Sequence, residues 1–274
     1  EIMSDWAKLD KMQKNTPVTW ARRLNLLKPF MHYLRQFEPL TEVPDEPIFG
    51  AIQSRLTPHI YHEQEIIDLL SAARGITPTG GLRPATYETL FGLIASTGMR
   101  ISEAVHLLDT DVDLKQGMLI IRQTKFTKSR QLPLHSSTVT ALLRYRQQRN
   151  QYVQMSPELP FFISVRGKRL GHAMGLRQIH RVFNSLSDQL GWINRGAHDR
   201  PRIHDLRHTF VVRRVMLWHK YGSDIDQAML ALSTYMGHVE ISYTYWYLTA
   251  VPELMAVAAS RFEVFAHTLE VGDD

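Results

Sequence analysis

The 274-residue sequence contains no cysteine. A disulfide framework is therefore excluded, and a reducing compartment is the simpler expectation. The sequence also lacks any apolar run approaching the ~18–20 residues that a membrane-spanning helix needs, and no signal peptide is visible. We therefore expect a cytoplasmic protein.

The charge balance is only mildly one-sided. Lys and Arg total 32 against 27 Asp and Glu, which gives a formal net charge of +5. The composition, 44% hydrophobic and 22% charged, is ordinary for a globular protein. A modest basic excess suits a nucleic-acid partner without requiring one. The length allows one large domain or two small ones.

Residues 1–40 are predicted to be helical. A helix that starts at Pro17 continues with apolar residues at spacings near 3.6, and Arg22, Arg23 and Lys28 lie among its polar positions. These three residues either form a solvated helix face or lie along DNA phosphates. Because one or two helices bury little core, we expect part of a small helical domain, truncated at its N-terminus.

Residues 41–56 contain prolines, show little periodicity and predict a linker. A larger region, 57–274, then carries several amphipathic helix patterns. Its main exception is a pair of strand-like runs at 118–122 and 131–134, which predict a β-hairpin with a basic tip. The apolar run 161–164 also favours a short strand. The fold is therefore predicted to be mainly α with a small β-sheet or hairpin.

The segment 202–210, RIHDLRHTF, combines groups suited to phosphate chemistry. Arg207 offers a planar fork of donors to two phosphate oxygens, and His204 and His208 can hold or pass a proton near neutral pH. The two histidines also form an HxxxH pair of the kind that binds zinc. Position 205 is Asp rather than the Glu of HExxH, and no third ligand is evident, so no metal is expected.

A tyrosine cluster follows at 243–247, YTYWY, shortly after His238. A tyrosine hydroxyl can attack phosphorus and become a covalent phosphotyrosine. Packing is nevertheless the ordinary role of a clustered aromatic side chain. On chemistry alone Tyr243, Tyr245 and Tyr247 are equivalent candidates.

Two basic residues upstream also have two interpretations each. Arg100 lies in a turn where Gly98 breaks a helix, so it either pairs with Glu103 or points into a cleft. Lys125 lies near the hairpin tip, where a lysine is ordinarily a solubilising edge charge. Alternatively, Lys125 donates a proton or contacts a phosphate from a flexible loop. Each residue alone supports a catalytic site only weakly, and the prediction of a site depends on their combination.

Set side by side, these segments resemble the tyrosine recombinase family, which includes phage integrases and Xer-like recombinases. The motifs that carry the resemblance are TGMRISEAVHL at 97–107, KFTKSRQLPL at 125–134, HDLRHTF at 204–210, and MGH at 236–238 with Tyr247 nine positions on. The resemblance covers residues 57–262, and residues 16–40 more loosely resemble the end of the family's core-binding domain. It implies a helical core-binding domain at 1–40, a linker at 41–56 and a catalytic domain at 57–274.

The resemblance implies roles for the basic residues. Arg100 and Arg207 would clamp the non-bridging oxygens of the scissile phosphate and stabilise its transition state. Lys125 would protonate the leaving 5′ oxygen, and its distance from Pro133 favours it over the second hairpin lysine. Phe126 stands where the family usually has glycine. The expected DNA contacts are Arg22, Arg23, Lys28, Lys128 and Arg130.

The remaining roles fall to the histidines and the tyrosine. His204 would orient the phosphate and assist proton transfer at the nucleophile, while His238 would hydrogen-bond the phosphate. The spacing from His238 selects Tyr247 as the nucleophile, which would form a 3′-phosphotyrosyl link. Trp246 is bulkier than its counterpart in many relatives. The resemblance implies no metal, no ATP and no other cofactor.

The implied partner is double-stranded DNA carrying specific recombination sites, bound by a homo-tetramer that is a monomer or weak oligomer when free. Such a protein would associate with the nucleoid. A final helix at 253–269 would dock either on its own domain or into a neighbouring copy. Two alternatives share the fold: a type IB topoisomerase that relaxes DNA, and a catalytically silent DNA-binding module.

Overall fold

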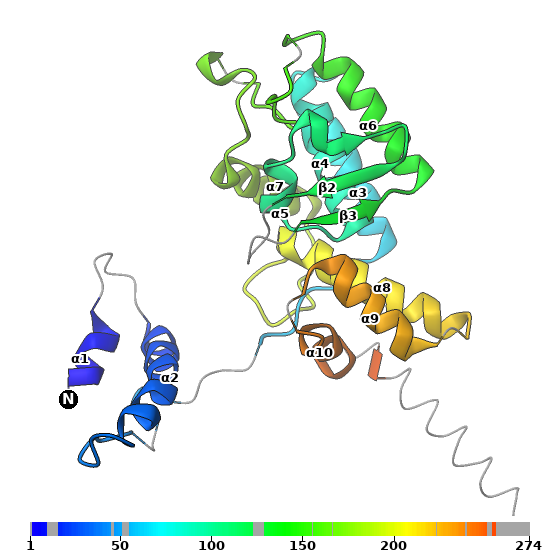
Figure 1. The fold of residues 1–274 in the computed structure, drawn as a ribbon. Helices are drawn as coiled ribbons and strands as arrows, with labels where there is room; N and C mark the ends of the chain where they lie inside the picture. Colours follow the sequence, from blue (N-terminus) through cyan, green and yellow to red (C-terminus); the bar gives the residue numbers. More distant parts are fainter. Residues whose placement is uncertain are drawn as a thin grey trace, which may run out of the picture. The chain divides into compact units, whose positions relative to one another are not determined.

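A computed structural model describes most of the chain, drawn as a ribbon in Figure 1. The described residues are 2–9, 16–44, 47–50, 55–122, 129–154, 156–165, 167–222, 224–238, 240–250 and 254–255. The chain divides into two compact units, Glu1–Leu56 and Thr57–Asp274. No helix within the described residues is long and apolar enough to cross a membrane.

The first unit contains helices α1 (Ile2–Lys8) and α2 (Pro17–Leu34). Arg23 on α2 donates hydrogen bonds to the backbone oxygens of Ala7 and Leu9, at 3.2 and 2.8 Å, and so ties α2 to the C-terminal end of α1. Of the three basic residues expected to contact DNA here, Arg23 therefore has an internal role. Arg22 is exposed and Lys28 is half-buried.

The second unit is mainly helical with one small sheet, so the predicted fold class is confirmed. Its helices are α3 (Glu63–Arg74), α4 (Leu82–Thr97), α5 (Ile101–Val105), α6 (Ser136–Arg149), α7 (Leu176–Leu190), α8 (Ile203–Lys220), α9 (Ile225–Met236) and α10 (Ser242–Ala250), with 3-10 turns η1 (Asp109–Asp111) and η2 (Gly167–Arg169). The strands are β1 (Val112–Asp113), β2 (Met118–Ile121) and β3 (Arg130–Pro133). Figure 1 shows α8, α9 and α10 grouped together on one side of this unit.

Helix α4 is central because it is apolar on almost every side. Its buried residues include Tyr87, Leu90, Phe91 and Ile94, and it packs against α3, α6 and α8. A helix without a polar face is stable only inside a core. A second, smaller apolar cluster joins α8, α9 and α10, and it includes Phe210 and Tyr247 among other residues.

The three strands form an antiparallel sheet in the order β1-β2-β3. Ile121 pairs with Arg130, so β2 and β3 form the predicted hairpin. Its tip, residues 123–128, lies outside the described residues together with Lys125 and Lys128. β1 was not predicted, because a two-residue strand has no readable periodicity.

The strand predicted at 161–164 is wrong. The structure has only isolated bridges nearby, Leu108 with Pro160 and Ile163 with Ala173. Phe161, Phe162 and Ile163 are all fully buried. A short apolar run surrounded by core on every side cannot be distinguished from a buried strand by its pattern.

Candidate active site

The turn that presents Arg100 depends on a glycine. Gly98 ends α4 in the left-handed conformation, with φ of 64°. A Cβ at this position would lie 2.6 Å from the Phe210 ring on α8, so a larger residue would push α4 and α8 apart. The chain reverses here and makes Arg100 the residue that precedes α5.

Arg100 forms the expected ion pair and also reaches the site. Its backbone N–H and its guanidinium each donate to the Glu103 carboxylate at 2.8 Å. A second guanidinium nitrogen donates to the backbone oxygen of Gly237 at 3.4 Å, 137 positions along the chain. The two interpretations of Arg100 are therefore compatible, because the ion pair aims the side chain toward the turn between α9 and α10.

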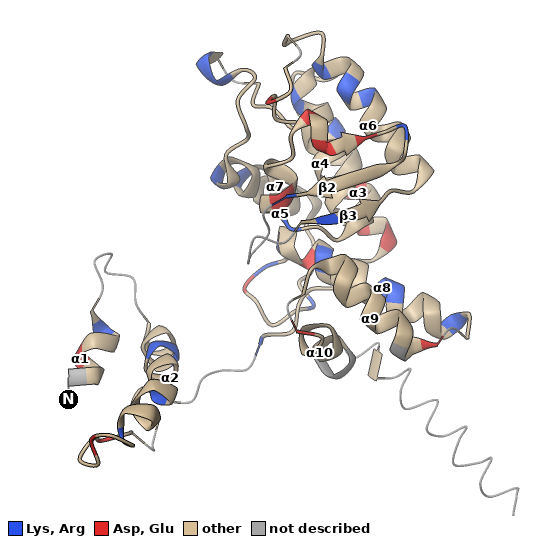
Figure 2. Cartoon of the chain, viewed as in Figure 1, with Lys and Arg blue, Asp and Glu red and all other residues tan. Residues whose placement is uncertain are grey.

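Glu103 is shared between two arginines. Arg130, at the start of β3, donates to both carboxylate oxygens of Glu103, at 3.1 and 2.8 Å. It also donates to the Tyr235 backbone oxygen at 2.9 Å. Burial alone would raise the pKa of Glu103, but the hydrogen bonds and charges of Arg130 and Arg100 outweigh it and lower that pKa. Figure 2 shows the acidic part of α5 beside the basic start of β3. Arg130, expected to contact DNA, is thus engaged inside the protein.

Arg207 lies on α8 and is only 2% exposed. It donates to the backbone oxygens of Gly98 and Met236, at 2.7 and 2.9 Å, and lies 3.0 Å from Nε2 of His238. Burial and the charge of Arg100 lower its pKa to about 10, so it stays charged at neutral pH. Among the ion pairs of the described residues, none joins Arg207 to a carboxylate.

Arg207 and Arg100 therefore converge on one turn, since they donate to the adjacent carbonyls of Met236 and Gly237. The backbone of Gly237 is left-handed, with φ of 66°. His238 follows it, with Nε2 facing Arg207 and Nδ1 lying 2.7 Å from the Thr244 hydroxyl on α10. Both ring nitrogens of His238 are thus engaged, which fixes the plane of the ring.

His204 and His208 lie one turn apart on α8, with ring centroids 4.7 Å apart and perpendicular planes. Loss of hydration among the packed groups, followed by the charges of Arg207 and Arg202, lowers the pKa of His204 to about 4. Although His204 is exposed at the surface and solvent screens part of this effect, these causes favour the neutral ring. His204 is therefore a weak base at neutral pH.

Tyr247 is the most enclosed of the three candidate tyrosines that the sequence left open. It is 3% exposed, against 38% for Tyr243, and its hydroxyl oxygen lies 2.6 Å from Nδ1 of His208. Tyr243 instead has its ring edge-on to His238, with centroids 6.3 Å apart. The geometry favours Tyr247 as the residue held for reaction, and its role stays a prediction.

The contact between His208 and Tyr247 was missed by sequence reasoning, which named His208 as a possible proton carrier and as half of a zinc pair but gave it no partner. The two residues are 39 positions apart on different helices. Only the position of His208, directly after Arg207, hinted that it shares the site. The part of the chain that the structure describes contains no group of three or more His, Asp or Glu placed to hold a metal ion.

The structure thus gathers Arg100, Arg207, His204, His238 and Tyr247 from the start of α5, from α8 and from the α9–α10 turn. A cavity of about 740 Å³ borders this cluster, lined by Arg100 and Glu103 and further out by residues that include His106 and Arg122.

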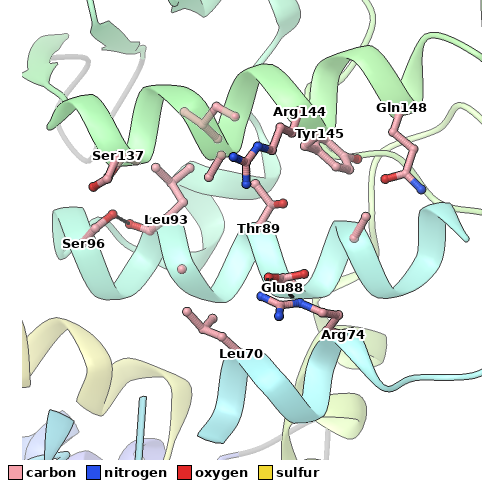
Figure 3. Close-up of a pocket in the computed structure, with 15 residues that line it drawn as sticks. Leu70, Arg74, Glu88, Thr89, Leu93, Ser96, Ser137, Arg144, Tyr145 and Gln148 are labelled. Atoms are coloured by element: carbon pink, nitrogen blue, oxygen red, sulfur yellow. Dashed lines mark hydrogen bonds and ion pairs between the residues drawn. The ribbon is translucent and has the colours of Figure 1, made fainter. Parts of the chain in front are cut away.

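A second cavity, of about 520 Å³, lies between α3, α4 and α6 (Figure 3). An Arg74–Glu88 ion pair lies at its edge, and Ser96, Ser137 and Gln148 also line it. None of the predicted site residues faces this cavity, so it is separate from the catalytic cluster.

Comparison with known proteins identifies the family. Residues 61–253 match the model of the phage integrase family. The protein y4rB of Sinorhizobium fredii (strain NBRC 101917 / NGR234), which carries a provisional integrase/recombinase name, is 37% identical over 268 residues, covering 96% of this chain and 83% of y4rB. Tyrosine recombinase XerC of Alcanivorax borkumensis is 26% identical over 229 residues, covering 84% of this chain and 68% of XerC.

A solved structure supports the same fold. The XerH site-specific recombinase, bound to a palindromic difH substrate in a post-cleavage complex, aligns with a TM-score of 0.64 at 17% identity. The alignment covers 96% of this chain and 72% of XerH. The predicted resemblance and the predicted enzyme class, a DNA strand transferase of the tyrosine recombinase type, are confirmed. The chain belongs to the phage integrase family.

Proposed function

We propose that this protein is a site-specific recombinase that cuts and rejoins duplex DNA through a 3′-phosphotyrosyl intermediate, without metal or ATP. The observation that carries the proposal is Arg207, a buried and charged guanidinium that forms no direct ion pair with a carboxylate among the described residues. Burying such a charge is costly unless a partner compensates it. A phosphate held jointly by Arg207 and Arg100 is that partner.

The two arginines supply the electrostatic part of catalysis. Each donates to a non-bridging oxygen of the scissile phosphate, and their charges stabilise the pentacoordinate transition state as negative charge accumulates. Their other donors are occupied by backbone oxygens and Glu103, so the guanidinium planes are fixed before DNA arrives. His238, held by Thr244 and beside Arg207, is placed at the same phosphate, and neutral His204 orients it.

The covalent step exchanges one phosphodiester for another. The Tyr247 oxygen attacks phosphorus, the bond to the 5′ oxygen breaks, and Lys125 supplies a proton to that oxygen, which is a poor leaving group as an alkoxide. The 3′-phosphotyrosyl link retains the energy of the broken bond, so a 5′ hydroxyl can rejoin the strand without ATP. Two arginines and a general acid take the place of a metal ion.

Basic residues outside the catalytic cluster support DNA as the substrate. Lys168 and Arg169 on η2 and Arg177 and Arg181 on α7 are exposed, and Figure 2 shows basic segments on α7 and on the loop before it. Phosphate contacts of this kind make affinity fall as salt concentration rises. Recombination joins two duplexes, so we propose a homo-tetramer on DNA, with the protein located at the nucleoid. The helix expected at 253–269, most of which lies outside the described residues, would link neighbouring copies.

The test uses a suicide substrate in the presence of EDTA. A library of duplexes with a randomised site and a nick just beyond the scissile position is incubated with the full chain. After cleavage the short 5′-hydroxyl fragment diffuses away, and a covalent protein–DNA adduct is trapped and detected on a denaturing gel. We expect an adduct with the unaltered protein and with Tyr243→Phe, but none with Tyr247→Phe.

The same gel separates the alternatives. No adduct from the unaltered protein would indicate a silent DNA-binding module, and an adduct that requires added metal would overturn the metal-free mechanism. A topoisomerase-like enzyme would give the adduct and relax supercoiled DNA. It would not exchange strands between two duplexes that carry the selected site, whereas a recombinase would.

A further inference from the structure

We infer that His208 is a catalytic residue that accepts the phenolic proton of Tyr247 during strand cleavage. The inference rests on the proposed function and assigns one of its steps to a residue outside the expected set. The Nδ1 atom of His208 lies 2.6 Å from the Tyr247 hydroxyl oxygen, which is direct hydrogen-bond contact. A general base must be within this reach of the proton it removes.

The other two histidines of the cluster are less suited to this step. His238 has Nε2 against the positively charged Arg207 and Nδ1 against Thr244, so neither nitrogen is directed at Tyr247. His204 has a pKa lowered to about 4, and a base this weak takes up a phenolic proton poorly. His208, in contrast, places Nδ1 directly against the Tyr247 hydroxyl oxygen.

Helices α8 and α10 hold His208 and Tyr247 in contact. His208 follows Arg207 on α8, so the helix that fixes the phosphate clamp also fixes the base. Tyr247 is delivered by α10, which packs on α9 and shares an apolar cluster with α8. The Trp246 ring, with its centroid 6.0 Å from that of His208, encloses the same pair. The unusual bulk of Trp246 thus has a place beside the proposed base.

Strand cleavage then involves two proton transfers, one at each end of the reacting phosphate. As the Tyr247 oxygen forms its bond to phosphorus, its proton passes to Nδ1 of His208, which becomes an imidazolium. The bond from phosphorus to the 5′ oxygen breaks, and that oxygen takes a proton from the Lys125 ammonium. Rejoining reverses both transfers: the 5′ hydroxyl gives its proton to the Lys125 amine, and His208 returns its proton to the departing Tyr247 oxygen.

The test compares His208→Asn with His204→Asn in the full chain. The amide oxygen of Asn stands close to the Nδ1 position of a histidine and can still accept a hydrogen bond, but it cannot take up a proton. Single-turnover adduct formation is measured on the nicked duplex, with DNA binding and thermal unfolding as controls for folding. We expect His208→Asn to bind DNA normally and to cleave about 10²–10⁴-fold more slowly, whereas His204→Asn, which loses a phosphate contact, should also weaken DNA binding.

A modified substrate separates loss of the base from loss of the acid. When sulfur replaces the bridging 5′ oxygen, the leaving thiolate needs no proton. This substrate should restore cleavage by Lys125→Ala and leave His208→Asn slow. His208→Asn that cleaves at nearly the unaltered rate, or that the sulfur substrate rescues, would overturn the inference.

A second variant covers the case in which His208→Asn does not fold. Imidazole added in solution should accelerate cleavage by His208→Ala and not by Lys125→Ala, and an equal lack of response in both would count against the inference. Failure of the proposed function looks different. It would appear as no adduct from the unaltered protein, or as an adduct that survives Tyr247→Phe, whatever His208 does.

Discussion

In two regions that the structure describes, a partly buried carboxylate bridges two arginines, and the second region has a further arginine beside them. Near α6, Asp109 pairs with Arg146 and Arg149. In the catalytic cluster, Glu103 pairs with Arg100 and Arg130. Arg207 lies beside the second group without a carboxylate of its own, so three arginines share one glutamate.

The most buried arginine of each region shows the difference clearly. Arg149 is 0% exposed; it donates to Asp109 at 2.6 Å and to the Phe161 backbone oxygen at 3.1 Å, and its guanidinium lies over the Phe161 ring. Arg207 is 2% exposed and contacts two backbone carbonyls and His238, with no direct carboxylate partner among the described residues. A charge kept without a counter-ion costs stability, and an anionic ligand explains why it is retained.

The largest effect should come from Arg207→Met, which keeps the volume and removes the charge. We expect strand cleavage to fall by at least ~10²–10³-fold, because a main stabilising group of the transition state is lost. The free energy of unfolding should fall less than in Arg149→Met, because removing a buried charge that has no paired carboxylate offsets the cost of leaving the Gly98 and Met236 carbonyls without a donor. Single-turnover cleavage and thermal unfolding measure the two quantities. A large loss of stability would mean that Arg207 is structural, and the comparison with Arg149 would fail.

Arg149→Met is the matched variant in the other region. It leaves Asp109 with a weaker set of partners and the Phe161 carbonyl without a donor, so we expect unfolding to become easier by about 3–5 kcal/mol. Urea unfolding measures this change. The folded fraction should cleave DNA at close to the unaltered rate, since Arg149 is not part of the catalytic cluster. Slow cleavage by fully folded protein would contradict the separation of the two regions.

Glu103→Gln tests the shared carboxylate through its pH dependence. The pKa of Glu103 is lowered from the ordinary 4.5 in the folded protein, so the folded state favours the ionised form. Its stabilisation is therefore complete above pH 4.5 and is lost as pH falls through the folded pKa. At neutral pH we expect the variant to be about 1–3 kcal/mol less stable.

The check is the difference in unfolding free energy between the unaltered protein and Glu103→Gln, followed downward from pH 7. This difference should shrink below about pH 4.5, because the protonated glutamic acid resembles glutamine. A difference that stays constant or grows in acid would mean that the carboxylate charge does not hold the two arginines.

Much of this arrangement could be predicted from the sequence because it is encoded locally. The strand-like runs at 118–122 and 131–134, on either side of a basic segment, indicated the hairpin. Gly98 indicated the turn that carries Arg100. The candidate catalytic residues were found because each lies in a short motif with its own chemistry, and the motifs occur in the order of a known family.

What the sequence did not contain is which groups face one another across the fold. Asp205 is the carboxylate nearest to Arg207 in the sequence, and it accepts hydrogen bonds from Arg202 instead. Arg130 looked like a DNA contact because the hairpin tip is basic, but its side chain turns back to Glu103. The lone charge of Arg207 and the contact of His208 with Tyr247 both depend on such long-range choices.

The smallest effect concerns Gly237, where the Arg130 guanidinium lies against the turn that carries His238. A Cβ at Gly237 would lie 2.8 Å from Nη1 of Arg130, and φ is +66°. Gly222 is the matched control, since its φ is +67° and nothing lies within 4 Å of its Cβ position.

Gly222→Ala should cost about 1–2 kcal/mol of unfolding free energy, which is the penalty of a left-handed alanine. Gly237→Ala should cost the same plus about 1 kcal/mol, because Arg130 must shift from the Glu103 carboxylate and the Tyr235 carbonyl. It should also slow cleavage, since Glu103 and the same turn hold Arg100, whereas Gly222→Ala should cleave normally. Equal values for both variants, in stability and in rate, would mean that Arg130 does not tie the sheet to the catalytic turn.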